Sequence, residues 1–202
     1  MNLQSILSSV LDEVYEKNEY PALAALESEW THTRPFDGLR VLVATPIYRN
    51  TMTEYRALVA GGADLLVGFS EFNDPDVVDF MREWGVPVVT PAEMLEAESR
   101  GEFVDLVLDC AGPFAVLHPK IGFVELTRSG VHYYKDAENR FTSPIAVSSS
   151  ASRPPWARVM AISAVSKSWA LVAISKARSY WFLVVATSVR GLRSRVFAVA
   201  AM

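Results

Sequence analysis

The sequence predicts an α/β fold: a parallel-sheet, Rossmann-like domain with a helical N-terminus and a poorly specified C-terminal tail. Over residues 3–126, short apolar runs rich in β-branched residues alternate with segments of helical periodicity. The apolar runs are nearly continuous, as expected of parallel strands that are buried on both faces. All 23 Asp and Glu residues lie within residues 1–139, and the apolar periodicity is lost soon after them.

Two helices are predicted before the first strand. In residues 3–17 the apolar side chains recur every three or four positions, which is typical of an amphipathic helix. Pro21 suits the first turn of a second helix over residues 21–30. The run from Arg34 to Gly38, with its Pro and its Asp-Gly pair, predicts a turn into the first strand.

Strands and helices then alternate. One helix is predicted over residues 51–60, a second over 76–84 with Asp74 as its N-cap, and a third begins at Thr90. The predicted strands cover residues 39–44, 63–68, 86–89, 103–108 and 122–126. Ligands of such sheets bind beyond the carboxyl ends of the strands. A site is therefore expected among residues 44–48, 68–73, 109–113 and 127–132.

Two of these loops carry candidate chemistry, each with an ordinary alternative. Residues 109–113 are either a loop whose Asp109 or Cys110 meets a ligand or a tight turn with a half-buried thiol. Residues 127–132 combine hydroxyls, a cation, a glycine and an imidazole, which suit a polar or anionic ligand, or they form a hydrophilic turn. The acidic run at residues 93–102 predicts a solvated helix face, and residues 118–120 predict a solvated loop.

Composition excludes several classes of site. With one cysteine and three scattered histidines, a disulfide framework, a multi-cysteine zinc site and a His-rich metal site are all excluded, so no metal is expected. No secretory signal and no bilayer-spanning run is evident, so a soluble cytoplasmic protein without membrane partners is expected. The dinucleotide fingerprint G-x-G-x-x-G does not occur in the sequence.

The order of short motifs resembles that of adenosylhomocysteinases from about residue 15 to residue 147. The resemblance opens with the helix at residues 20–29 and the strand entry at 35–41. It continues with GADL (62–65), GVPV (85–88), LDCAGP (108–113), HPK (118–120), ELTRSGVH (125–132) and SPIAV (143–147). Each motif is short, but their order and spacing are those of the family.

The resemblance implies a substrate-type α/β domain over residues 1–147. The family hydrolyses S-adenosylhomocysteine to adenosine and homocysteine, and its bound NAD transiently oxidises the ribose 3′-hydroxyl. For this chain it implies a nucleoside ligand, NAD, a cytoplasmic homo-oligomer and a place in one-carbon metabolism. The implied substrate-binding residues are Asp109, Cys110 and His132, and the implied cofactor-binding residues are Thr127, Arg128 and Ser129.

Two functions follow from the resemblance. The first is NAD-dependent hydrolysis of a thioether nucleoside, S-adenosylhomocysteine or a relative, by a complete protein. The second is non-catalytic nucleoside binding or interaction on the same scaffold. The second is favoured by Pro46, Tyr48, Cys110 and Leu126, which stand at four of the family's acid–base or substrate positions. No catalytic residue is therefore assigned.

Residues 148–202 allow three interpretations. Residues 140–202 carry 9 Lys and Arg and no acid, which suits a basic segment that binds nucleic acid. The tail is alternatively the degraded start of an NAD-binding domain. We favour the third interpretation, a coding sequence read out of frame, because a GC-rich frame shift yields Ser, Ala, Arg and Val and loses acids. Nucleic acid is accordingly not an expected partner.

Overall fold

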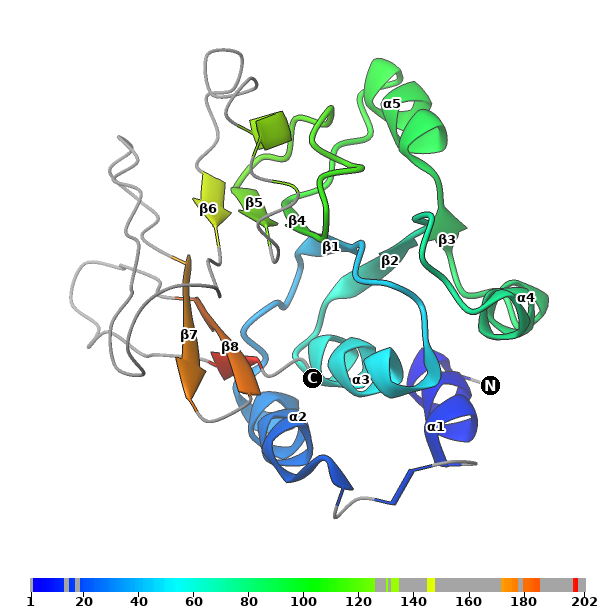
Figure 1. Cartoon of the computed structure of the whole chain (residues 1–202), viewed down its shortest axis with the longest axis vertical. Helices are drawn as coiled ribbons and strands as arrows, with labels where there is room; N and C mark the ends of the chain where they lie inside the picture. The colour runs from blue at the N-terminus through cyan, green and yellow to red at the C-terminus, as the bar shows by residue number, and fades with distance from the viewer. Residues whose placement is uncertain are drawn as a thin grey trace.

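The centre of the fold is a six-stranded, all-parallel sheet with strand order β3-β2-β1-β4-β5-β6 (Figure 1). The computed structural model describes residues 2–12, 15–16, 19–125, 130 and 132–134, and the backbone of residues 145–147, 172–177, 180–185 and 198–199. The strands are β1 (Arg40–Val43), β2 (Asp64–Gly68), β3 (Val88–Val89), β4 (Leu106–Asp109), β5 (Gly122–Glu125) and β6 (Ile145–Val147). This is the strand order of a doubly wound Rossmann sheet, so the predicted fold class is confirmed.

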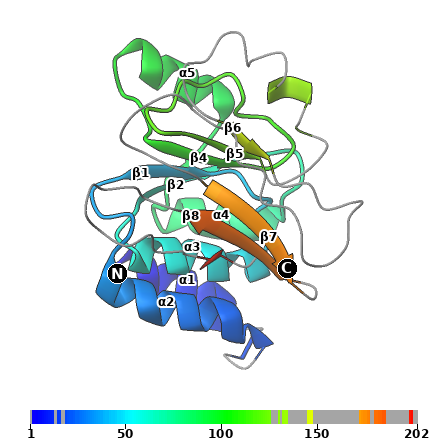
Figure 2. The ribbon, with the colours of Figure 1, turned by 90° about the vertical axis from the view of Figure 1, so that its left-hand side faces the viewer.

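The helices cover the two faces of the sheet unequally (Figure 2). They are α1 (Leu3–Asp12), α2 (Pro21–Thr33), α3 (Met52–Ala60), α4 (Pro75–Glu83) and α5 (Pro91–Ser99). Val41 and Val43 of β1 pack in a core with α1 to α4, whereas Leu42 packs in a second core with Met94 of α5. Successive strand residues thus point to opposite faces, and both faces are buried, which explains the continuous apolar runs.

Local sequence signals set the helix starts as predicted. The Asp74 side chain accepts a hydrogen bond from the Asp76 N–H at 3.0 Å and caps α4. Thr90 and Glu93 form a reciprocal capping box at α5, in which the Glu93 N–H donates to Thr90 Oγ1 at 3.3 Å. Each cap satisfies backbone N–H groups that a helix leaves without an internal partner.

The first helix is shorter than predicted. α1 is described over Leu3–Asp12, and Tyr15 and Glu16 are not helical, whereas the apolar pattern predicted a helix over residues 3–17. Residues 13, 14 and 17 lie outside the described residues. The last turn of α1 carries no basic residue, and an acidic group there opposes the helix dipole. Asp12 is instead paired with Arg56 of α3 at 3.5 Å.

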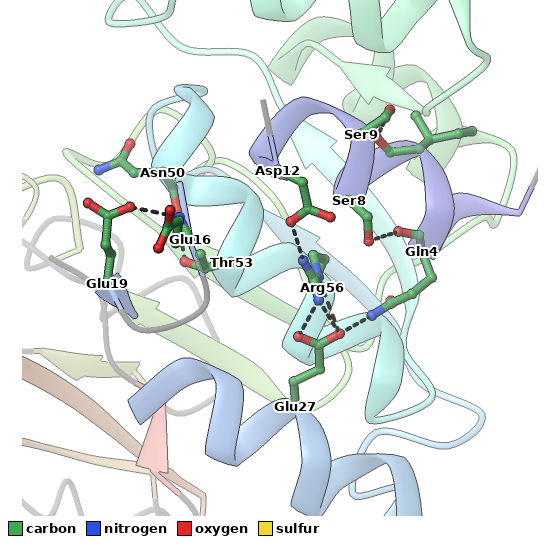
Figure 3. Close-up of polar contacts among 11 residues, drawn as sticks. Gln4, Ser8, Ser9, Asp12, Glu16, Glu19, Glu27, Asn50, Thr53 and Arg56 are labelled. Carbon is green, nitrogen blue, oxygen red and sulfur yellow. Dashed lines mark hydrogen bonds and ion pairs between the residues drawn. The ribbon is translucent and has the colours of Figure 1, made fainter. Parts of the chain in front are cut away.

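Arg56 joins the three N-terminal helices, as Figure 3 shows. Its side chain is 9 % exposed and lies 3.0 Å from Glu27 of α2, in addition to Asp12 of α1. Gln4 of α1 donates to the same Glu27 carboxylate. The helical N-terminus is therefore fixed to the sheet domain through α3 by a buried cation between two carboxylates.

The strand predicted at 103–108 begins later, at Leu106. Asp105 lies just before it, and its Oδ2 accepts a hydrogen bond from the Arg40 N–H at 2.8 Å. The Asp105 side chain therefore accepts the hydrogen bond from the Arg40 N–H that a longer β4 would accept through its backbone.

Three short strands lie in the basic tail. β7 (Val172–Ala177), β8 (Tyr180–Val185) and β9 (Ala198–Val199) form an antiparallel sheet in the order β7-β8-β9. β8 pairs antiparallel with both of its neighbours, whereas the strand before a dinucleotide-binding loop belongs to a parallel sheet. The three interpretations of residues 148–202 stay predictions. In the described part of the chain, no helix is long and apolar enough to cross a membrane.

Candidate functional site

The sheet has its switch point between β1 and β4. The chain that leaves β1 enters α3, whose Met52 and Tyr55 pack in the core on the α1-to-α4 face. The chain that leaves β4 turns to the other face, where Phe114 and Leu117 pack in the second core. Because consecutive connections leave to opposite sides here, this carboxyl edge is where open α/β sheets bind ligands.

Hydrogen bonds to two residues of α3 fix the loop after β1. Thr45 Oγ1 donates a hydrogen bond to Glu54 Oε2 at 3.0 Å, and the Tyr55 hydroxyl donates to the Thr45 carbonyl oxygen at 3.1 Å. All three residues are buried. The same loop is fixed to the loop after β2, since the Ile47 N–H donates to Asn73 Oδ1 at 2.8 Å.

The loop after β4 is organised by Asp109, which is fully buried. Its Oδ1 accepts the Cys110 N–H at 2.8 Å. Its Oδ2 accepts the Phe114 N–H at 3.1 Å and the Tyr134 hydroxyl at 2.5 Å. Three protein donors thus hold one carboxyl group, and the loop 109–114 closes around it.

The backbone of this loop is strained at Ala111. Its φ of 69° lies in the left-handed region that residues with a Cβ rarely adopt, and Gly112 follows at 79°. The Ala111 N–H donates to Glu125 Oε1 of β5 at 3.1 Å. A Cβ on Gly130 would lie 2.3 Å from the Glu125 carboxyl carbon, so this glycine leaves room for it. Such backbone strain concentrates at functional sites.

Burial sets the electrostatics of this edge. Burial raises the pKa of Glu54 to about 7, although the hydrogen bond from Thr45 lowers it. Burial also raises the pKa of Asp109, against the lowering effect of Tyr134 and two backbone N–H groups. Burial raises the pKa of the Tyr55 hydroxyl, and the charges of Glu54 and Cys110 raise it further. Raised pKa values that cluster in this way are typical of functional sites.

The structure brings together part of the predicted site. Asp109 and the half-buried Cys110 lie at the switch point. His132 is exposed, and its ring lies 4.0 Å from that of Tyr133. Thr127, Arg128 and Ser129 lie outside the described residues, and their cofactor role stays a prediction. Residues 109–113 form a tight turn with a half-buried thiol, as one alternative predicted. The same turn lies at the carboxyl edge of the sheet, so the other alternative, a loop that meets a ligand, stays a prediction.

The acidic run on α5 does not form a uniformly solvated face. The Glu98 side chain is only 7 % exposed, because it accepts hydrogen bonds from the His118 N–H at 2.7 Å and pairs with His118 Nδ1 at 3.1 Å. The loop at residues 118–120 was predicted to be solvated, and the His118 side chain is indeed 58 % exposed. Lys120 follows it and donates its N–H to the Val104 carbonyl oxygen, which precedes β4. His118 therefore belongs to the amino side of the sheet, away from Cys110.

The sequence placed the loop 44–48 at the site without singling out Thr45 in it, and it did not indicate Glu54, Glu125 or Tyr134 as residues of the site. One signal was available for Glu54 and one for Glu125. Glu54 is the only acid in the helical segment 52–60, and Glu125 ends an apolar strand. Tyr134 reaches Asp109 only through the fold.

Metal ligands do not gather at this edge. Within the described residues, no group of three or more His, Cys, Asp or Glu side chains could hold a metal ion. Buried hydroxyl and carboxyl groups instead brace the two loops of this edge, and the half-buried thiol of Cys110 lies beside them.

Comparison with known proteins gives no assignment: no family model matches the chain, and no curated protein matches it. Function therefore has to be argued from the fold and from this edge.

Proposed function

We propose that the chain binds a nucleoside, in the manner of an adenosylhomocysteinase substrate domain, at the carboxyl edge between β1 and β4. The observation that carries the proposal is the strained loop 109–112, braced by two buried carboxyl groups at the switch point. The resemblance supplies the ligand class, a thioether nucleoside such as S-adenosylhomocysteine or a relative.

Binding without turnover is the form that the site supports best. By the resemblance, Pro46 stands at the position of the family's catalytic histidine, Tyr48 at that of a substrate threonine and Cys110 at that of an acid–base aspartate. Proline has no side-chain group that transfers a proton. Asp109 is retained, but its oxygens already accept bonds from Cys110, Phe114 and Tyr134.

NAD-dependent hydrolysis of the same nucleoside is the second candidate. It is favoured by Asp109, Gly112 and Gly130 and by the Val-His pair at 131–132, which match the family. NAD is proposed on resemblance alone, because the chain contains no G-x-G-x-x-G and residues 127–129 lie outside the described part. A homo-oligomer and a cytoplasmic location are proposals on the same resemblance.

The test is ligand-induced stabilisation of the purified full-length chain. Adenosine and S-adenosylhomocysteine are expected to raise the melting temperature, because a ligand at 100 times its Kd stabilises the folded state by about 2.7 kcal/mol. Ribose and homocysteine serve as ligand controls. The variant Arg40→Ala, at the opposite edge of the sheet, should respond to adenosine like the unaltered chain.

Three readouts separate the candidates. A shift with adenosine but no release of homocysteine supports binding alone. Copurified NAD together with homocysteine release supports hydrolysis. No shift with adenosine, S-adenosylhomocysteine or NAD would remove both candidates.

A further inference from the structure

Aromatic rings stand exposed around the proposed site. Tyr48 follows β1 and is 44 % exposed, Phe72 follows β2 and is 63 % exposed, and Tyr133 follows β5 and is 50 % exposed. Isolated exposed aromatic side chains are ordinary, but these three share the carboxyl edge of one sheet. None of the three is needed for the core.

Tyr48 has a fixed backbone on the β1 side of the switch point. Its N–H donates to Thr51 Oγ1 at 2.9 Å, and its carbonyl oxygen accepts the Thr51 N–H at 3.1 Å. The preceding Ile47 is bonded to the loop after β2 through Asn73, and its carbonyl oxygen accepts the Asp74 N–H at 2.8 Å. The ring is therefore exposed on a loop that is anchored on both sides.

Tyr133 occupies the other side. Its ring lies against Gly112 of the strained loop, where a Cβ would come within 2.6 Å of the ring. The His132 ring lies 4.0 Å from it, tilted by 37°. Gly112 thus admits an aromatic ring over the loop after β4, and His132 supports that ring from a neighbouring position.

We propose that Tyr48 and Tyr133 bind the base of the nucleoside by stacking, one from each side of the switch point. This inference rests on the proposed function and names the part of the ligand that is recognised. Stacking of a base on an aromatic side chain is favourable for every base, because every base has a π-face. The two residues would therefore favour any purine nucleoside over a sugar or an amino acid.

The first test compares ring-removing and ring-keeping variants by calorimetric titration with adenosine. Tyr48→Leu and Tyr133→Leu should each raise the Kd roughly tenfold, the range expected for loss of one stacking contact. Tyr48→Phe and Tyr133→Phe keep the ring and should stay within about twofold. Phe103→Leu is the matched control, since Phe103 is an exposed ring that precedes β4 at the amino edge of the sheet, and the Kd of this variant should equal that of the unaltered chain.

The second test needs no variant. Saturation-transfer NMR on the unaltered chain, with irradiation of aromatic protons, should saturate adenosine H2 and H8 more strongly than the ribose protons.

Each result decides between the inference and the proposed function. Leucine variants that bind adenosine as tightly as the unaltered chain, or stronger saturation of the ribose, would overturn stacking while nucleoside binding stands. Absence of adenosine binding by the unaltered chain would overturn both. If a leucine variant fails to fold, the NMR result decides.

Discussion

The acidic residues at the two edges of the parallel sheet have different partners: cations at the amino edge and neutral donors at the carboxyl edge. At the amino edge, Asp64 lies 3.0 Å from Arg40, and Asp105 lies 3.2 Å from Lys120. The Arg40, Asp64 and Lys120 side chains are exposed, so water shares in their solvation. Exposed pairs of this kind contribute little to stability and cost little to form.

At the carboxyl edge the acids are buried and meet neutral donors. Glu54 accepts a hydrogen bond from the Thr45 hydroxyl. Asp109 accepts hydrogen bonds from the Tyr134 hydroxyl and from two backbone N–H groups. Removing a carboxyl from water without a paired cation is unfavourable, and this explains the raised pKa values there.

The contrast separates a solvated surface from the proposed site. Buried carboxyl groups beside a strained loop are features that ligand-binding edges commonly retain.

Removing the Asp109 carboxyl should have the largest effect. Asp109→Ala leaves the Tyr134 hydroxyl and the N–H groups of Cys110 and Phe114 buried without their acceptor. We expect a loss of about 3–5 kcal/mol in the free energy of unfolding, measured in urea. Asp109→Asn keeps a carbonyl acceptor and should lose less. A loss below about 1 kcal/mol for the alanine variant would contradict a bracing role for this carboxyl.

Glu54 should make stability depend on pH. Its pKa rises from 4.5 to about 7 in the folded state, so between these values the folded chain holds a proton that the unfolded chain has released. The contribution of Glu54 is therefore greatest below pH 4.5 and is lost as the pH rises to about 7. At about 1.4 kcal/mol per pKa unit, the change is on the order of 3 kcal/mol.

The matching variant is Glu54→Gln, which keeps an acceptor for Thr45 and cannot ionise. Urea unfolding between pH 4.5 and 8 should show a flatter profile than the unaltered chain. Glu93→Gln is the control that should leave the slope in this pH window unchanged, because hydrogen bonds from Thr90 lower the pKa of Glu93 from 4.5 and its effect on stability therefore falls below pH 4.5. If Glu54→Gln follows the unaltered chain at every pH, the burial of Glu54 does not control its protonation.

A substitution of Arg56 shows how a largely buried acid, Glu27, behaves when its paired cation is removed. Arg56→Met keeps most of the apolar stem but leaves Glu27 facing a buried, uncharged neighbour. We expect a loss of about 2 kcal/mol, since Glu27 is partly exposed and Asp12 largely so. Combining Arg56→Met with Glu27→Gln should recover part of this loss. Full additivity of the two variants would mean that the pair does not interact.

The smallest effect is expected at the amino edge. Asp64→Asn breaks the exposed pair with Arg40 and should change the free energy of unfolding by less than about 1 kcal/mol. A change as large as that of Asp109→Ala would remove the contrast between the two edges.

The elements of the domain could be predicted because their signals are local. The caps at Asp74 and Thr90 lie within three residues of the N–H groups that they bind. The same holds for the apolar strand runs, which follow from burial on both faces. The helix predicted over residues 3–17 does not include Tyr15 and Glu16, which are not helical although the apolar pattern of the sequence continues past Asp12.

The site could be predicted only in position. Strand order places residues 44–48 and 109–113 at one edge, but the bracing of Asp109 by Tyr134 joins residues 25 positions apart. The left-handed Ala111 carries no sequence signal, since alanine is not a residue that favours this conformation. Burial of Glu54 likewise depends on α1 and α2 covering α3, which no local pattern indicates.

We propose that a nucleoside occupies the edge between β1 and β4. Cys110, the single cysteine of the chain, lies at that edge. The rate of Cys110 alkylation by N-ethylmaleimide, followed by mass spectrometry of the full-length chain, reports directly on that place. Cys110→Ser confirms that the label is on this thiol. We predict that saturating adenosine slows alkylation several-fold, whereas ribose does not. An alkylation rate unchanged by adenosine, at concentrations that raise the melting temperature, would place the ligand elsewhere and contradict the account.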